Sequence, residues 1–251
     1  MIVRRSGREI ECMRAAGAIV AETLEVCRRM ALPGVTTGAI DAEADVCIRK
    51  AGGTSLFKGY RGYPGNICVS VNEEVVHGIP GTRVLQDGDA LSVDVGVRLG
   101  GYCADAAVTI PVGRWTPETT RLAEVCRESL DRAIGVLRPG VSLSTVCRAI
   151  QTYVESQGFS VVRRYTGHGI GREMHEDPQV PNFFARSMTD VTLPEGAVLA
   201  IEPMINAGRP EVEVLKNGWT VVTKDRAWSA HFEHTVAIRE TGPDILTLRR
   251  T

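Results

Sequence analysis

The sequence predicts an α+β fold in which two similar halves each contribute helices to one layer and strands to a shared antiparallel sheet. Hydrophobic residues recur at helical spacing in four segments, whereas the other apolar segments are short and alternating. A Pro-Gly motif, a helical segment and a glycine also occur twice, 106 residues apart. The chain of 251 residues is long enough to bury a substantial core.

The first helix is expected at residues 6–31. Ser6 and Glu9 have the spacing of a capping box, and Pro33-Gly34 ends the periodic pattern. The hydrophobic residues between these signals lie on one stripe, which indicates an amphipathic helix. Three more helices are predicted in the same way, at residues 37–50, 117–137 and 143–156.

Strands are expected where short apolar runs are bounded by glycine, proline or asparagine. In the first half these runs are residues 66–71, 91–97 and 102–110. In the second half they are residues 161–165, 197–202, 219–223 and 230–239.

The repeated motif begins at Pro33 in the first half and at Pro139 in the second, and its closing glycines are Gly52 and Gly158. As an alternative to duplication, Pro-Gly commonly occurs in the turn between two helices. Because the offset, the helix length and the element order all match, duplication is the favoured interpretation. The sequence thus predicts one domain over residues 1–251, with halves at about 6–113 and 114–247, and a site between them would draw ligands from both.

Composition excludes several classes of protein. Lys and Arg total 29 and Asp and Glu total 30, so there is no basic excess for binding nucleic acid or an anionic membrane. The seven cysteines form no Cys-x-x-Cys pair, which favours free thiols in a reducing compartment. Neither a signal peptide nor a membrane span is evident. We therefore expect a cytoplasmic protein without nucleic-acid or membrane partners.

Two aspartates are expected to face each other across a hairpin. If the turn centres between Leu99 and Gly100, Asp94 lies directly opposite Asp105, and the alternating valines and leucines occupy the other face. Facing carboxylates are destabilising unless a shared proton or bound cations neutralise them. The alternative is a pair of exposed aspartates at a sheet edge.

Three further residues strengthen the cation hypothesis. His168 lies between glycines after a predicted strand, Glu202 ends another strand, and Glu233 lies on a strand whose apolar residues face the other way. A buried unpaired glutamate costs several kcal/mol. Four carboxylates and one imidazole on one sheet face could hold two divalent ions, with Asp105 and Glu233 bridging, in an arrangement suited to hydrolysis.

Several motifs containing or flanking these residues resemble the type I methionine aminopeptidases, within the wider "pita-bread" metallohydrolases. The resemblance spans about residues 6–247, and the motifs are Gly59-Tyr60-Arg61-Gly62-Tyr63-Pro64, Ser70-Val71-Asn72 through His77-Gly78-Ile79-Pro80, Gly167-His168-Gly169-Ile170-Gly171, Ile201-Glu202-Pro203-Met204 and Gly218-Trp219. It implies the pita-bread fold and a single catalytic domain. It also implies removal of the initiator methionine from nascent chains with a small second residue, through a water activated by two metal ions.

The resemblance also implies roles for individual residues. Asp94 would chelate one metal, Asp105 and Glu233 would bridge both, and His168 and Glu202 would complete the other shell. Glu202 would also take the proton of the attacking water. His175 would bind the substrate amide and the developing oxyanion, with His77 beside the scissile bond. The methionine pocket would be lined by Tyr60, Tyr63, Cys68 and Trp219.

Some assignments stay open at this stage. Cys68 could equally be a core residue, and the carboxylate-rich ligand set suits Co, Mn, Fe or Zn. A monovalent cation near Asn72 is a weaker inference. His231 and His234 flank Glu233; His231 is expected on the same face as Glu233, and His234 is expected to be structural.

Departures from the family pattern concern selectivity. Phe57 stands where a small residue is frequent, and Met174 stands where phenylalanine is frequent. Ala106 would remove a hydrogen bond to the metal ligands. The expected partners are nascent N-termini and, transiently, the ribosome, with a monomeric enzyme. Because Ile2 is bulky, Met1 should be retained.

Two alternatives remain. Prolidases and X-Pro aminopeptidases share the fold but usually carry a separate N-terminal domain, and none is evident before the first helix. A degenerate binding protein of this fold typically loses metal ligands, whereas all five are present. Cleavage of Met-Ala-Ser against X-Pro peptides would separate the enzymes, and absence of turnover with any divalent ion would favour the binding protein.

Overall fold

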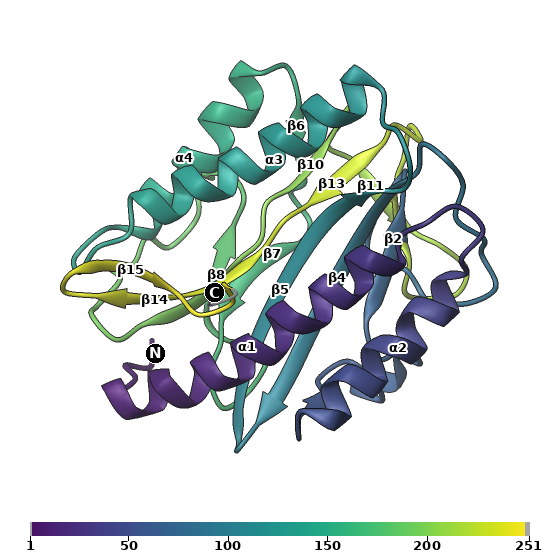
Figure 1. The fold of residues 1–251 in the computed structure, drawn as a ribbon. Coiled ribbons are helices and arrows are strands. Elements are labelled where there is room, and N and C mark those ends of the chain that lie inside the picture. Colours follow the sequence, from purple (N-terminus) through teal and green to yellow (C-terminus); the bar gives the residue numbers. More distant parts are fainter. Residues whose placement is uncertain (1, 249–251) are drawn as a thin grey trace.

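The computed structural model describes residues 2–248, so the prediction about Met1 lies outside the described residues. Its helices are α1 (Gly7–Met30), α2 (Thr37–Lys50), α3 (Pro117–Gly135) and α4 (Leu143–Ser156), with a short 3₁₀ turn at Tyr60–Gly62. All four predicted helices are therefore confirmed. Helices α1 and α2 lie together, as do α3 and α4, and both pairs lie on the side of the sheets that faces the reader in Figure 1. None of the helices in the described part of the chain is long and apolar enough to cross a membrane.

The first helix begins as expected. The Ser6 hydroxyl accepts the Glu9 N–H, and the Glu9 carboxylate accepts the Ser6 N–H, so two backbone donors at the helix start are satisfied reciprocally. The buried stripe of α1 includes Ile10, Met13 and Val20.

The strands form four sheets, and every recorded pairing is antiparallel. The predicted α+β class is thus confirmed, with the strands divided among several sheets. One sheet has the order β1-β4-β2 with β5 paired to β4, and another has the order β15-β14-β9-β7-β8. The two smaller sheets are β13-β10-β6 and β11-β12-β3. The strand bounds are β1 (Thr54–Ser55), β2 (Cys68–Val71), β3 (Glu74–Val76), β4 (Ala90–Leu99), β5 (Tyr102–Pro111), β6 (Ser160–Val161), β7 (Thr166–Gly169), β8 (Glu176–Pro181), β9 (Val198–Ile201), β10 (Met204–Asn206), β11 (Val212–Val214), β12 (Val221–Thr223), β13 (Ser229–His231), β14 (His234–Arg239) and β15 (Gly242–Ile245).

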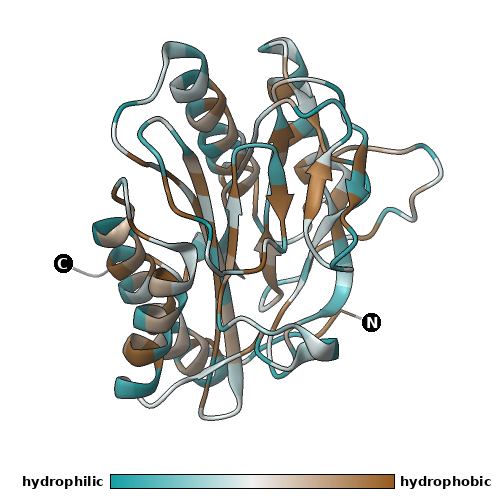
Figure 2. Ribbon diagram, turned by 90° about the vertical axis from the view of Figure 1, so that its right-hand side faces the viewer, coloured by the Kyte–Doolittle hydropathy of each residue, from teal (hydrophilic) through white to brown (hydrophobic). Residues whose placement is uncertain are grey.

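Two large hydrophobic clusters hold the helices against the sheets. The N-terminal core packs α1 and α2 on β2, β4 and β5, and the C-terminal core packs α3 and α4 on β6, β8, β9 and β14. Figure 2 shows the corresponding hydrophobic colouring along the strands and on parts of each helix. Thr235 connects the two parts, because its hydroxyl donates to the Asp105 carbonyl and accepts the Asp105 N–H. Since the helices cover one side of the sheets, the other side is available for a site.

The predicted register of the β4–β5 hairpin is wrong. Leu99 pairs with Tyr102, so Asp94 lies opposite Ala107 and Asp105 lies opposite Gly96. The reason is the turn: Gly100 and Gly101 have φ values of 57° and 82°, as a two-residue type I′ loop requires, so the turn centres between the glycines. The two aspartates are diagonal neighbours, and they still share one face because their partners differ by two residues.

Two strand predictions in the second half are also corrected. Residues 161–165 are not one strand, because β6 ends at Val161 and β7 starts at Thr166; His168 therefore lies within a strand. The predicted strand at 230–239 is interrupted at Phe232 and Glu233. There the chain changes partners, since β13 pairs with β10 whereas β14 pairs with β9. The Glu233 N–H donates to the Ala107 carbonyl at the break.

Candidate metal centre

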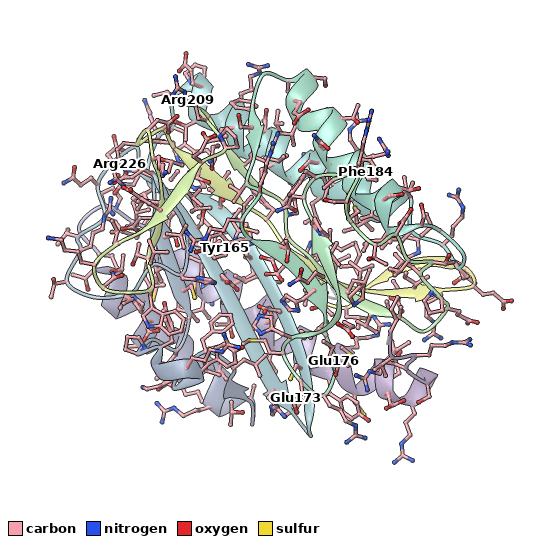
Figure 3. The ribbon with its side chains drawn as sticks, turned by 180° about the vertical axis from the view of Figure 1, so that it is seen from behind. Tyr165, Glu173, Glu176, Phe184, Arg209 and Arg226 are labelled. Carbon is pink, nitrogen blue, oxygen red and sulfur yellow. The ribbon has the colours of Figure 1, made fainter. Side chains whose placement is uncertain are left out.

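A cavity of about 800 Å³ opens on the side of the sheets that the helices leave free. In the view from behind, Tyr165 and Glu176, both of which line it, lie on this side (Figure 3). The structure brings to this one cavity all the residues expected to bind the divalent metals, to act in catalysis or to line the methionine pocket: Tyr60, Tyr63, Cys68, His77, Asp94, Asp105, His168, His175, Glu202, Trp219 and Glu233.

Four carboxylates form the charged end of the cavity. Asp94 lies on β4 and Asp105 on β5, whereas Glu202 directly follows β9 and Glu233 lies in the break between β13 and β14. This excludes the alternative of two exposed edge aspartates, because Asp105 is only 4% exposed and the Oδ1 atoms of both Asp94 and Asp105 are buried.

Burial raises the pKa of each of these carboxyl groups. The pKa of Asp105 rises to about 7 and that of Glu202 to about 8, while those of Asp94 and Glu233 lie well above their usual range. After burial, the neighbouring carboxylates are the next contribution for Asp94, Asp105 and Glu233. The charged end therefore needs protons or cations to neutralise it.

The unpartnered atoms favour cations. Asp94 Oδ1, Asp105 Oδ1 and Glu233 Oε1 are buried and accept no hydrogen bond. Asp105, His168 and Glu233 each offer one ligand atom, and these atoms all lie within 4.8 Å of one another. Buried polar atoms without partners are rare in native proteins unless an ion or water completes them. The residues present thus fit a divalent metal, for which oxygen donors with one imidazole are suitable ligands.

His168 has the orientation that a ligand needs. Its Nδ1 lies 2.9 Å from the Gly169 carbonyl oxygen, which assigns the proton to that nitrogen and leaves Nε2 as an acceptor. Nε2 points toward Glu202, 3.6 Å from Oε1. Burial lowers the His168 pKa to about 4, so the ring is neutral at pH 7 and its lone pair is available.

His231 is the residue at the charged end to which sequence reasoning gave no role. It is 1% exposed, its Nε2 lies 3.6 Å from Glu202 Oε2, and that nitrogen has no hydrogen-bond partner. The available signal was its position two residues before Glu233. His234 differs, because its Nδ1 lies 2.8 Å from the Thr247 hydroxyl, in agreement with the structural role expected for it.

Two histidines stand between the charged end and the rim. His175 Nδ1 lies 3.1 Å from the Tyr60 hydroxyl, and its ring centre lies 4.4 Å from that of His168. His77 has a φ of 59° and contacts Tyr165 and Trp219 edge-on. Burial lowers the pKa of both rings, that of His77 to about 4, so both are neutral near pH 7.

The other end of the cavity is apolar. Phe57, Tyr63, Cys68 and Met174 form a buried cluster, and Tyr60 and Trp219 pack against it. The Tyr63 hydroxyl donates to the Gly78 carbonyl at 2.7 Å, so its polar group is satisfied within the protein. Cys68 pairs with Asp94 across β2 and β4, belongs to the buried cluster and also lines the cavity, so its role in the methionine pocket stays a prediction.

Three sequence departures can now be located. Phe57 and Met174 belong to this apolar cluster, and a Cβ at Gly96 would lie only 2.8 Å from the Phe57 ring, so Phe57 fills space that glycine leaves. Ala106 lies opposite Val95 in the N-terminal core, on the face away from the carboxylates. The expected loss of a hydrogen bond to the ligands at Ala106 is therefore wrong.

Asn72 is occupied by protein partners. Its Nδ2 donates to Asp89 and its Oδ1 accepts the Ala90 N–H, both at 2.9 Å. A monovalent cation near this residue stays a prediction, which would have to rely on other oxygens.

Comparison with known proteins agrees with this geometry. Residues 11–240 match the model of metallopeptidase family M24. The chain is 51% identical to methionine aminopeptidase 1 of Bacillus subtilis over 98% of this chain and 99% of that protein. It is 44% identical to methionine aminopeptidase of Escherichia coli K12, over 98% and 94% of the two chains.

The crystal structure of methionine aminopeptidase from Thermotoga maritima superposes with a TM-score of 0.96 at 45% identity, over 100% of both chains. A Xaa-Pro dipeptidase from Bacillus anthracis shares the fold, with a TM-score of 0.79 at 22% identity. This match covers 99% of this chain but 62% of the dipeptidase. The chain therefore belongs to metallopeptidase family M24, with its pita-bread fold. Within that family, the full-length similarity places it among the methionine aminopeptidases.

Proposed function

We propose that this protein hydrolyses the peptide bond after an N-terminal methionine, preferring substrates with a small second residue. The observation that carries the proposal is the composition of one cavity. Buried carboxylate oxygens without partners lie at one end, and an apolar pocket of Phe57, Tyr63, Cys68 and Met174 lies at the other. The first end suits hydrolysis, and the second suits an unbranched thioether side chain.

The charged end is proposed to hold two divalent ions. Asp94 would bind one, His168 and Glu202 the other, and Asp105 and Glu233 would reach both. When bound, such ions lower the pKa of a water molecule and polarise the scissile carbonyl. Co, Mn, Fe and Zn all remain compatible with this set of donors.

The protein's own groups supply proton transfer and orientation. Glu202 lies between two imidazoles, 3.6 Å from each, and is placed to accept the proton of the attacking water. His175 is placed to donate to the substrate carbonyl as negative charge develops there, since Tyr60 holds its other nitrogen. His77 would orient the substrate from the opposite rim, beside Trp219.

The substrate side chain would lie against Tyr60, Tyr63, Cys68 and Trp219. Burial raises the pKa of the Cys68 thiol, so it is protonated and inert at pH 7, which suits a pocket wall. Because the second residue would lie close to the metal ligands and His175, a bulky side chain there would clash. By this rule Met1 of the chain itself, which precedes Ile2, would be retained.

The remaining features of the proposal concern context. The substrates are N-termini of nascent chains, with transient ribosome contact through the catalytic domain. All seven cysteines are free, which supports a reducing cytoplasm. We infer a monomer whose single catalytic domain arose from two halves, at about residues 6–113 and 114–247.

The proposal is tested by peptide cleavage. Metal-free protein is titrated with Mn²⁺, Co²⁺, Fe²⁺ or Zn²⁺ in turn, and release of methionine from Met-Ala-Ser is measured against Met-Ile-Ser and an X-Pro peptide. We expect turnover only of Met-Ala-Ser. Preferred cleavage of the X-Pro peptide would establish a prolidase of the same fold, and no turnover with any ion would refute both enzymes.

A further inference from the structure

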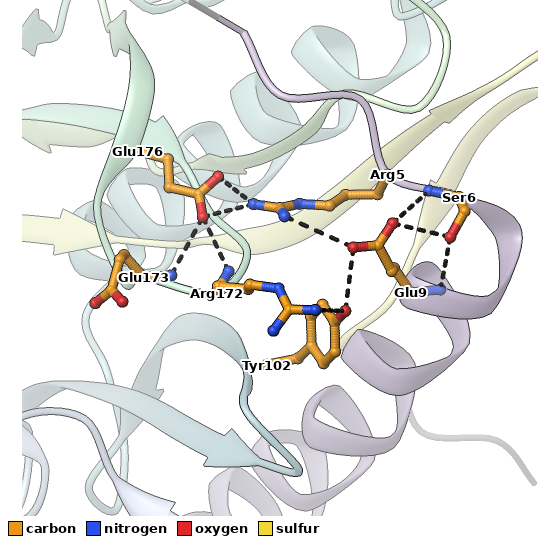
Figure 4. Close-up of polar contacts among 7 residues, drawn as sticks. All are labelled: Arg5, Ser6, Glu9, Tyr102, Arg172, Glu173 and Glu176. Carbon is orange, nitrogen blue, oxygen red and sulfur yellow. Dashed lines mark hydrogen bonds and ion pairs between the residues drawn. The ribbon is translucent and has the colours of Figure 1, made fainter.

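The N-terminal arm before α1 reaches the rim of the cavity through Arg5. The Arg5 N–H donates to the Gly196 carbonyl at 2.7 Å, which fixes the arm beside the start of β9. The Arg5 side chain is only 6% exposed, and its guanidinium Nη2 contacts both carboxylate oxygens of Glu176 (Figure 4). This ion pair joins residues 171 positions apart.

Glu176 also closes the loop that carries His175. Residues 170–175 connect β7, which contains His168, to β8, which starts at Glu176. Glu176 Oε1 accepts the Arg172 N–H at 2.9 Å and the Glu173 N–H at 3.2 Å. One carboxylate thus binds two backbone donors of this loop and the guanidinium of the arm.

The guanidinium lies directly against the loop backbone. A Cβ built on Gly171 would lie 2.1 Å from Arg5 Nη2 and 2.6 Å from Nε, so only glycine leaves room for the arginine. The first turn of α1 also reaches the loop through Tyr102, whose hydroxyl donates to Glu9 at 3.1 Å and accepts from Arg172 at 2.8 Å. The loop is therefore held from both sides by α1 and its arm.

We propose that Arg5 is a positioning residue for His175, acting through Glu176. This inference rests on the proposed function, in which His175 contacts the substrate. A nearly buried ion pair is rigid when complete, and removal of one partner leaves the other charge unpaired. Without Arg5, Glu176 is drawn toward solvent and the loop loses the acceptor of two N–H groups. His175 then samples positions away from the reacting carbonyl.

The test compares Arg5→Met with Arg14→Met. Arg14, which lies on α1, is a matched control, because it also pairs with a carboxylate far away in sequence, Asp244, at 2.5 Å, but does not contact the loop. We expect Arg5→Met to lower kcat on Met-Ala-Ser by about 10- to 100-fold with KM changed less than about twofold, since displacements near 1 Å have effects of this size. Arg5→Lys, which keeps the charge, should recover much of the loss, and Arg14→Met should keep the wild-type kcat.

A second readout does not depend on activity. Hydrogen exchange of the Arg172 and Glu173 amides, measured on metal-free protein, should accelerate in Arg5→Met and stay unchanged in Arg14→Met. Equal kcat values for the two variants, or unchanged exchange in Arg5→Met, would overturn the positioning role. If the wild type does not cleave Met-Ala-Ser, the proposed function fails, and the exchange experiment still decides whether Arg5 orders the loop.

Discussion

The two ends of the cavity differ in how completely their polar groups are partnered. At the charged end, three carboxylates and His231 each keep a buried atom without a hydrogen-bond partner. At the apolar end, the Tyr63 hydroxyl is bonded to a backbone carbonyl and the Cys68 thiol is protonated. The charged end thus contains buried polar atoms that lack partners, whereas the polar groups of the apolar end are satisfied within the protein. This difference indicates that the charged end binds cations and that the apolar end recognises a side chain by its shape alone.

Replacing a shared ligand should have the largest effect. Asp105→Asn should lower kcat/KM on Met-Ala-Ser by about 10³-fold or more, because metal stabilisation of the transition state amounts to several kcal/mol. The metal-free variant should unfold at a temperature equal to or above that of the wild type, since a neutral amide removes repulsion among buried carboxylates. Asp244→Asn, outside the cavity, is the control for activity and should leave kcat/KM unchanged. Wild-type activity in Asp105→Asn would remove the charged end from the mechanism.

His231 should give the next largest effect. His231→Asn removes the imidazole beside Glu202 and should lower kcat by roughly 10- to 100-fold, the range found for groups that orient metal ligands. His234→Asn is the matched control, because His234 is three residues further along the chain and its Nδ1 lies 2.8 Å from the Thr247 hydroxyl instead. Steady-state kinetics at saturating metal measures kcat for both variants and the wild type. Equal kcat values would assign both histidines to structure.

The apolar end should respond in KM. Phe57→Ala opens space beside Tyr63 and Cys68, and we expect roughly a tenfold rise in KM for Met-Ala-Ser with little change in kcat. The metal content of this variant, measured by elemental analysis, should equal that of the wild type. Loss of metal together with methionine binding would show that the two ends are not independent.

The smallest expected effect is a pH dependence of stability without metal. The folded pKa values of Asp105 and Glu202 are raised to about 7 and about 8, so protonation favours the folded state. Their contribution is complete below the unfolded values near 4 and is lost as pH rises through 7 and 8. The buried histidines have lowered pKa values, so their protonation affects stability only below about pH 6.5. We expect the metal-free Tm to fall by several degrees from pH 6.5 to 8.5.

Saturating Mn²⁺ should abolish most of this decrease, because bound cations replace the protons. A metal-free Tm that rises over the same interval would contradict the assigned shifts. Differential scanning fluorimetry in matched buffers measures both series.

Local sequence signals predicted the helices well. The Ser6 capping box and the Pro-Gly punctuation act within a few residues, and the helix bounds follow from them. The β4–β5 register was missed because two adjacent glycines allow more than one turn centre, and only their left-handed φ values decide it. The error did not move Asp94 and Asp105 apart, because a shift of two residues keeps both on one face.

Long-range features could not be obtained in this way. The break at Glu233 arises because the chain leaves one sheet and enters another, which no local pattern records. The proximity of His231 to Glu202, and the contact between Arg5 and Glu176, likewise depend on how distant segments pack. The four carboxylates could nevertheless be singled out, because carboxylates in otherwise apolar strands are conspicuous in a sequence. His77, His175 and the pocket residues came only from the family resemblance, and the structure brings them to the same cavity.

Metal stoichiometry tests the central claim most directly. Metal-free wild type and the Asp105→Asn/Glu233→Gln double variant are dialysed against Mn²⁺ or Co²⁺, and bound metal per chain is measured by elemental analysis. We expect two ions per wild-type chain, together with a higher Tm, and none retained by the double variant. Equal binding by both proteins, or Met-Ala-Ser cleavage by wild type that holds no metal, would contradict the account.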